Sequence, residues 1–183
     1  MIDESIFDDI ARRLPAGLDV IESTIGIHWA LYGLVRLTRP ETILEIGCCY
    51  GDATCFLVRA AIHNGMGHVI GYEPDGNRAD ATKGKVARAC GADAPFELRG
   101  GFPVEHGPVV AADFVFLDLD PKEHYPLAFQ HLLLSPGGLL CTHDLTYLRD
   151  MLEVRKFHDS LKDLGWETLG LPQERGLSIA RKP

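Results

Sequence analysis

The sequence predicts an α/β fold, a single domain with a seven-stranded, mostly parallel β-sheet whose last strand is antiparallel. Short apolar segments alternate with amphipathic segments from residue 42 to residue 164, a pattern typical of βαβ units. The apolar segments are continuous, as expected for strands that helices cover on both faces. The last two, "WETLGL" and "GLSIAR", are separated only by "PQER", which is too short for a parallel crossover.

Local signals predict where each element begins and ends. Asp3 can cap a helix over residues 4–13, which ends before Pro15, and Ser23 or Thr24 can cap a second helix that stops before Pro40. The "SPGG" segment ends a later helix, and Gly91 is placed to cap another. The predicted strands are 42–46, 68–73, 95–99, 113–120 and 138–144, and the helices between and after them are 52–63, 77–90, 125–134 and 147–164.

Composition excludes several classes of protein. The 183 residues carry a formal net charge of −8, and no basic stripe of the kind that binds nucleic acid is present. No apolar run reaches about 18 residues, so we expect no transmembrane helix and no membrane partner. The five cysteines are an odd number without C-x-x-C spacing, which favours free thiols and a cytoplasmic location.

The segment "ETILEIGCCYGDAT" (41–54) leaves the first predicted strand through two glycines, Gly47 and Gly51. A phosphate-binding loop would need a lysine that is absent, and a dinucleotide-binding G-x-G-x-x-G would need glycine where Cys49 stands. The carboxylate of Glu45 suits a cationic group, and Glu73 ends the second strand, where an acid grips ribose hydroxyls in nucleotide-binding α/β folds. The turn therefore predicts a ribose-bearing ligand with a positive charge near Glu45.

Four motifs in order then give a resemblance. "LEIGCCYGDAT", "GYEPD", "FVFLDLDPKEHY" and "LSPGGLLCTHD" resemble motifs of class I S-adenosylmethionine (SAM)-dependent methyltransferases, in the small-molecule, catechol O-methyltransferase-like branch. The resemblance implies a Rossmann-like sandwich over residues 25–183 and a helical lid over residues 1–24. It also implies an enzyme that transfers a methyl group from SAM to a small-molecule acceptor, with a hydroxyl oxygen as the expected target.

The same resemblance implies roles for individual residues. The turn would hold the methionine part of SAM, with Glu45 near its ammonium group. Glu73 would bind the ribose, and the segments after the second and third strands would border the adenine. Asp118 would face both the sulfonium and a metal. The cofactor-binding residues implied in this way are Glu45, Gly47, Cys48, Gly51, Glu73, Pro74, Gly101, Phe102 and Asp118.

Acids and a histidine end the fourth and fifth predicted strands. Asp118 and Asp120 end one strand, and His143 and Asp144 end the next, so neighbouring strands would bring them together. Such a set suits Mg²⁺ or another divalent cation, held by Asp118, Asp144 and His143. The metal-dependent members of the resembled family follow this aspartate with asparagine, whereas Leu145 stands here. If no metal binds, His143 is the candidate base, with Asp118 beside it.

Two other functions stay open at this point. A SAM-binding protein without catalysis would share the turn but would not need the acid cluster. A nicotinamide-dependent oxidoreductase is disfavoured by Cys49 in place of glycine. Because the chain has little beyond the cofactor fold, the walls of an acceptor site would come from residues 1–24, from 145–150 or from a second copy in a homodimer.

Overall fold

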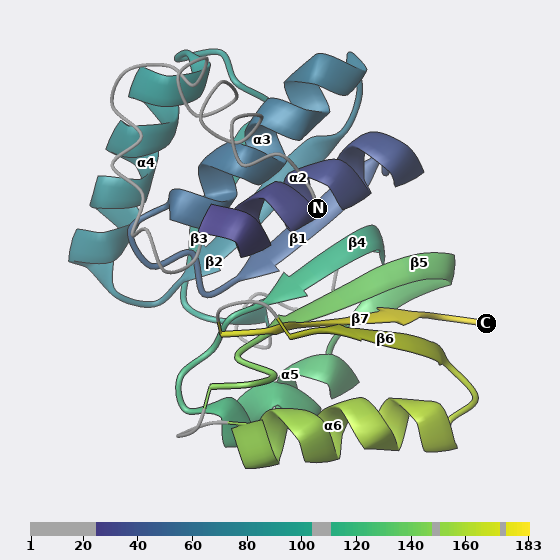
Figure 1. Ribbon diagram of the computed structural model, residues 1–183. Helices are drawn as coiled ribbons and strands as arrows, with labels where there is room; N and C mark the ends of the chain where they lie inside the picture. The colour runs from purple at the N-terminus through teal and green to yellow at the C-terminus, as the bar shows by residue number, and fades with distance from the viewer. Residues whose placement is uncertain (1–24, 104–110, 148–150, 173–174) are drawn as a thin grey trace.

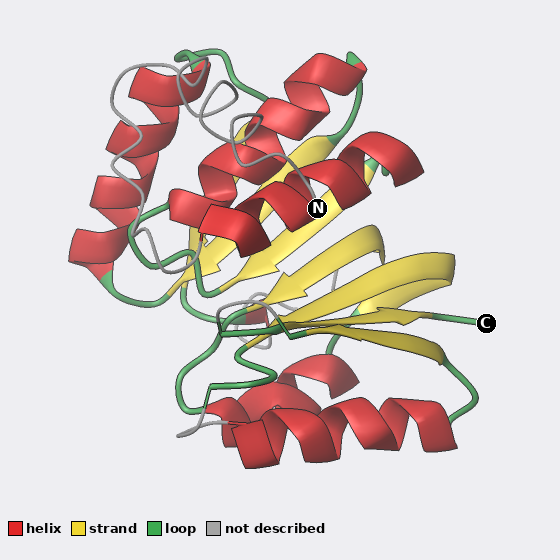
Figure 2. Cartoon of the chain, in the orientation of Figure 1, coloured by secondary structure: helices red, strands yellow, loops and turns green. Residues whose placement is uncertain are grey.

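A computed structural model describes residues 25–103, 111–147, 151–172 and 175–183. A central sheet is covered by helices α2, α3 and α4 on one face and by α5 and α6 on the other (Figures 1 and 2). The predicted helix over residues 4–13, and with it the lid over 1–24, lies outside the described residues. None of the helices within the described ranges is both long and apolar enough to cross a membrane.

The elements follow the predicted alternation of strand and helix. The strands are β1 (Thr42–Ile46), β2 (His68–Glu73), β3 (Phe96–Gly100), β4 (Ala111–Leu117), β5 (Leu133–His143), β6 (Glu167–Leu171) and β7 (Leu177–Arg181). The helices are α2 (Ile25–Thr38), α3 (Asp52–Asn64), α4 (Gly76–Cys90), the 3₁₀ turn η3 (Lys122–His124), α5 (Tyr125–Gln130) and α6 (Met151–Asp163).

The seven strands form one sheet in the order β3-β2-β1-β4-β5-β7-β6. The strands β1 to β5 pair in parallel, whereas β7 pairs antiparallel with both β5 and β6. The α/β class, the seven strands and the antiparallel last strand are therefore confirmed. The strand order reverses between β1 and β4, and ligands of open parallel sheets bind beside such a reversal, outside the carboxyl ends of the strands.

Alternation along each strand builds two apolar cores. Ile43 of β1 packs with α2 and α3, whereas Leu44 and Ile46 face the layer of α5 and α6. Phe114 and Phe116 of β4 belong to the first core, and Val115 and Leu117 to the second. Strands buried on both faces explain why these segments are continuously apolar.

Several predicted boundaries are wrong, and the "SPGG" segment that was expected to end a helix lies inside β5. The helix predicted over 125–134 ends at Gln130, and Leu133 and Leu134 begin β5, because they pair with Ala111 and Ala112 of β4. Pairing with a buried strand thus overrides the helical pattern of this apolar run. The strand predicted over 113–120 ends at Leu117, so Asp118 and Asp120 lie in the following loop and do not share a strand face.

Candidate functional site: a cleft at the carboxyl ends of the strands

The glycine turn passes directly against the neighbouring strand end. Gly47 has φ +92°, and a Cβ atom built there would lie 2.4 Å from the backbone oxygen of Asp118. Its N–H donates to the carbonyl oxygen of Tyr72 at 2.9 Å, which ties the turn to the end of β2. Only glycine accommodates this conformation and this approach without strain, so the turn is held close to the strand ends.

Glu73 fastens the second strand end to the same turn. One carboxylate oxygen accepts from the backbone N–H of Cys49 at 2.8 Å, and the other accepts from that of Asp75 at 3.0 Å. The side chain is buried, yet it borders the cleft described below. Each carboxylate oxygen can accept a further hydrogen bond, so Glu73 remains able to bind a hydroxyl group.

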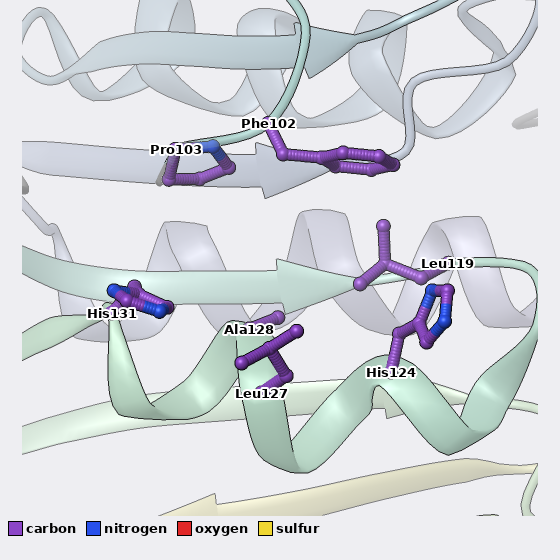
Figure 3. Close-up of a pocket in the computed structure, with 7 residues that line it drawn as sticks. All are labelled: Phe102, Pro103, Leu119, His124, Leu127, Ala128 and His131. Carbon is purple, nitrogen blue, oxygen red and sulfur yellow. The ribbon is translucent and has the colours of Figure 1, made fainter. Parts of the chain in front are cut away.

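A cleft of about 200 Å³ lies at the carboxyl ends of β1, β2 and β4. Five of the predicted site residues line it, namely Gly47, Glu73, Pro74, Phe102 and Asp118. Phe102 and Leu119 also border an apolar cavity of about 70 Å³ between the β3 end and α5 (Figure 3). The two hollows thus adjoin along a shared wall, one polar and one apolar.

Other predicted cofactor residues do not line the cleft. Glu45 is completely buried on the face of β1 that packs against α3, and neither carboxylate oxygen has a hydrogen-bond partner among the described residues. Burial raises the pKa of Glu45 to about 8, and the neighbouring side chains of Thr54 and Cys48 offset only part of that rise. Glu45 is therefore not part of the cleft wall, and its expected position near the ammonium group of SAM stays a prediction.

Cys48 and Gly51 pack against elements behind the turn and do not line the cleft. The Cys48 sulfur lies so near β2 that a Cβ atom on Gly71 would be 2.6 Å from it. Gly51, with φ +83°, approaches Thr82 of α4. Of the two adjacent cysteines, Cys49 and not Cys48 lines the cleft. Gly101 does not line it either.

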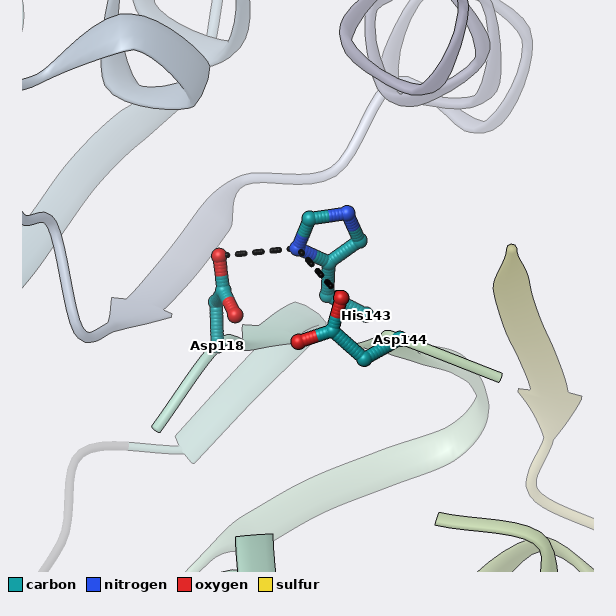
Figure 4. Close-up of side chains that lie close together, drawn as sticks. All are labelled: Asp118, His143 and Asp144. Atoms are coloured by element: carbon teal, nitrogen blue, oxygen red, sulfur yellow. Dashed lines mark hydrogen bonds and ion pairs between the residues drawn. The ribbon is translucent and has the colours of Figure 1, made fainter. Parts of the chain in front are cut away.

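The predicted acid and histidine cluster is assembled as expected (Figure 4). Adjacent strands β4 and β5 place Asp118 and His143 together, with 3.0 Å between Oδ2 of Asp118 and Nδ1 of His143. The same nitrogen lies 3.8 Å from Asp144 Oδ1. Nε2 of His143 is buried and has no hydrogen-bond partner among the described residues. The imidazole is thus oriented by an acid on one side and unpaired on the other.

Lys122, which was not predicted, lies inside this cluster. Its ammonium nitrogen is 2.7 Å from Asp118 Oδ1, 2.9 Å from Asp144 Oδ2 and 3.7 Å from Asp120 Oδ1. Burial raises the pKa of Asp118, but the neighbouring His143 and Lys122 outweigh it and hold that pKa well below its usual value. Burial likewise lowers the pKa of Lys122, and its two close carboxylates outweigh it, so the pKa is raised.

Arg175, also not predicted, closes the far side of the cluster. Its Nη2 donates to Asp144 Oδ2 at 2.9 Å, and its guanidinium lies 4.2 Å from the centroid of the Tyr147 ring. The backbone N–H of Thr146 donates to the Arg175 carbonyl at 2.9 Å. The connection between β6 and β7 is therefore tied to the end of β5, and a second cation reaches the cleft wall.

The fit of a divalent cation can be judged from these contacts. Asp118, His143 and Asp144 each offer a ligand atom, all within 4.8 Å of one another. However, Asp118 is already paired with Lys122, and Asp144 is paired with both Lys122 and Arg175. Leu145 offers no donor atom where the resembled metal enzymes have asparagine. As they stand, these residues do not fit a hard divalent cation.

Three further histidine and tyrosine side chains differ in their surroundings. The Tyr125 hydroxyl donates to the Leu117 carbonyl at 3.1 Å and its ring is fully buried. His28 of α2 is buried against Phe56, and burial lowers its pKa to about 4. His124 faces the apolar cavity (Figure 3). His124 therefore borders a cavity, whereas Tyr125 and His28 are buried in the core.

No protein-family model matches the sequence, and no curated protein matches it significantly. Solved structures do match. The O-methyltransferase from Bacillus cereus in complex with S-adenosylhomocysteine (SAH) is 23% identical, with a TM-score of 0.70 over 98% of this chain and 89% of that chain. TomG, an O-methyltransferase of tomaymycin synthesis from Streptomyces achromogenes in complex with SAM, is 20% identical, with a TM-score of 0.67 over 98% and 85%.

A third similar structure is the SAH-bound methyltransferase PaMTH1 from Podospora anserina, which is 16% identical. Its TM-score is 0.69, with 100% of this chain and 97% of that chain covered. At such low identities the likeness concerns the fold, and it covers at least 98% of this chain and between 85% and 97% of the others. The chain thus has the Rossmann-like fold found in SAM-dependent O-methyltransferases.

Proposed function

We propose that the protein is a SAM-dependent methyltransferase that acts on a hydroxyl oxygen of a small molecule. The observation that carries this proposal is the cleft at the carboxyl ends of β1, β2 and β4, where Gly47, Glu73 and Asp118 converge. That position is the ligand site of open α/β sheets. The similar structures crystallised with SAH or SAM have the same fold.

Each part of the cofactor has a matching wall in this proposal. The free carboxylate lone pairs of Glu73 accept from the two ribose hydroxyls, and Gly47 lets the methionine part lie against the bare backbone. The adenine rests against Phe102 and Leu119, beside the apolar cavity. The sulfonium faces Asp118, which is ionised and has 31% of its side chain exposed to the cleft.

In the reaction, an acceptor oxygen attacks the methyl carbon of SAM, the carbon–sulfur bond breaks and SAH leaves with the bonding electron pair. The acceptor hydroxyl must also lose its proton. We assign that proton to His143, because its Nδ1 lies 3.0 Å from Oδ2 of Asp118, which lines the cleft. The protein's main contribution is alignment of oxygen, carbon and sulfur, which can supply on the order of 7–11 kcal/mol.

Calorimetry with SAM, SAH and NADH tests the cofactor class. We expect SAM and SAH to bind with one site per chain and NADH not to bind. Binding of NADH without SAM would replace the proposal with an oxidoreductase. Binding of SAM with no methyl transfer to any hydroxylated acceptor in a library would favour a SAM-binding protein without catalysis.

The ribose assignment predicts a loss of affinity in Glu73→Ala. Removing a charged acceptor of two hydroxyl hydrogen bonds should weaken SAH binding by roughly 1–3 kcal/mol. The matched control is Asp80→Ala, which removes an exposed acid from the outer face of α4. Equal SAH affinity in the Glu73 variant, the control and the unmodified protein would contradict the assignment.

A further inference from the structure

We infer that the Lys122 ammonium group takes the place that a divalent cation would have, so that the acid cluster functions without a metal. Lys122 is the first residue of η3, and its side chain reaches between Asp118 and Asp144. One nitrogen thereby contacts an oxygen from each of the two carboxylates that would hold a metal. The inference concerns these side chains alone and does not depend on the bound ligand.

Burial shows that this position is built into the structure. The Lys122 side chain is 3% exposed and the Asp144 side chain is completely buried. The ammonium group also lies 5.5 Å from the centroid of the buried Tyr125 ring, which favours a cation there. A charge so far from water remains only where it is paired. The two acids supply that pairing, so Lys122 is a fixed part of the cluster.

The charges of the cluster balance without a metal. Asp118 and Asp144 carry two negative charges, and Lys122 and Arg175 supply two positive charges within hydrogen-bonding distance of them. A divalent ion bound to the same oxygens would be a few ångströms from both cations, and the repulsion in a partly buried site would be large. A metal would therefore have to displace Lys122 from both carboxylates that now pair with it.

The carboxylate oxygens are also already engaged. Mg²⁺ takes oxygen ligands in near-octahedral geometry, with water completing what one or two free carboxylates begin. Here Leu145 follows Asp144 with an apolar side chain that is itself buried, and the oxygens of Asp144 are shared between Lys122 and Arg175. On the proposed function, the consequence is methyl transfer that persists in EDTA, with Lys122 as the positive charge beside the acceptor oxygen.

Manganese binding tests the inference without any cofactor or acceptor. Mn²⁺ is titrated into the full-length protein and free Mn²⁺ is followed by electron paramagnetic resonance. We expect no saturable site in the unmodified protein. Lys122→Met removes the charge and keeps approximately the length of the side chain. The freed carboxylates should then form a saturable Mn²⁺ site, at least about tenfold tighter than any residual binding by the unmodified protein. Lys85→Met, which removes another largely buried lysine from its ion pair with Asp52, should gain nothing.

Each outcome decides the question. A saturable Mn²⁺ site in the unmodified protein that Asp144→Asn abolishes would overturn the inference. A folded Lys122→Met variant with no gain in Mn²⁺ binding would overturn it too, because the carboxylates would then not form a cation site. If circular dichroism shows that Lys122→Met is unfolded, Lys122→Gln takes its place under the same criteria. Failure of SAM to bind would refute the proposed function and leave this result unaffected.

Discussion

Glu45 is a buried carboxyl group whose protonation links the glycine turn to the stability of the protein. Its pKa is about 8 in the folded state because burial disfavours the charged form, whereas an exposed glutamate in the unfolded chain has a value near 4.5. Between these two values the folded state holds a proton that the unfolded state releases. The contribution of Glu45 to stability is therefore greatest at and below the pKa of the unfolded chain, and it decreases as the pH rises toward the pKa of the folded state.

We expect Glu45→Gln to remove this decrease in stability at rising pH. The free energy of unfolding of the unmodified protein should fall on the order of 1 kcal/mol per pH unit relative to the variant across this range. Urea unfolding at pH 5.5, 7 and 8.5 measures the difference. Glu41→Gln, which alters an exposed side chain, is the matched control and should follow the unmodified protein. Parallel pH profiles for Glu45→Gln and the unmodified protein would show that the buried carboxyl group is not held protonated.

At the same scale, the sequence predicted the acids of the site better than their partners. Glu73, Asp118 and Asp144 end apolar strands, and that position alone assigns them to the carboxyl edge of a parallel sheet. Lys122 and Arg175 carry no such signal, since one follows a loop proline and the other belongs to a hairpin connection far along the chain. Only the side-chain contacts show that both reach the same two carboxylates.

Among the elements, the turn between β1 and α3 depends most on a particular backbone conformation. Gly47→Ala would place a methyl group 2.4 Å from the Asp118 carbonyl oxygen at φ +92°. Strain of this kind costs on the order of 1–3 kcal/mol before any clash is counted. We expect Gly47→Ala to lower the unfolding midpoint and to abolish detectable SAH binding.

Gly33→Ala provides the opposite expectation on a regular helix. Gly33 lies inside α2, and a Cβ atom there meets no atom within 4 Å. Alanine should therefore stabilise the protein by about 0.5–1 kcal/mol through its helix propensity, with SAH affinity unchanged. Chemical unfolding and calorimetry of the two variants side by side separate turn geometry from a general effect of adding a methyl group. A Gly47→Ala variant that unfolds and binds SAH as the unmodified protein does would remove the turn from the site.

The order of the elements was predictable because apolar periodicity changes at most boundaries. The assignment of the run "LLL" at 132–134 to a helix or a strand was not predictable. Three leucines fit a buried helix end and a buried strand equally well. Their assignment depends on β4, which supplies Ala111 and Ala112 as pairing partners. Pairing between distant segments leaves no local trace, and this is why the end of α5 and the beginning of β5 were wrong.

At the scale of the whole molecule, parallel strands gather the functional loops at one end. The turn after β1 and the loops after β2 and β4 come from separate parts of the chain, and they meet because their strands run in the same direction. The opposite end of the sheet has a larger cavity, of about 310 Å³, lined by residues such as Thr38, Arg39 and Asp113. Volume alone would favour that second cavity as a ligand site, whereas the topology favours the first.

Hydrogen exchange distinguishes the two ends of the sheet. SAH at a hundredfold excess over its dissociation constant should add about 2.7 kcal/mol to the free energy of unfolding. Amides that exchange by local opening should gain protection at 47–51, 73–78 and 118–122, which border the cleft at the carboxyl ends. Those at 38–41 and 136–138 border the other cavity and should exchange at the same rate with and without SAH. Protection confined to 38–41 and 136–138 would place the ligand at the amino ends of the strands, and the geometry of Gly47 and Glu73 would then have no part in binding it.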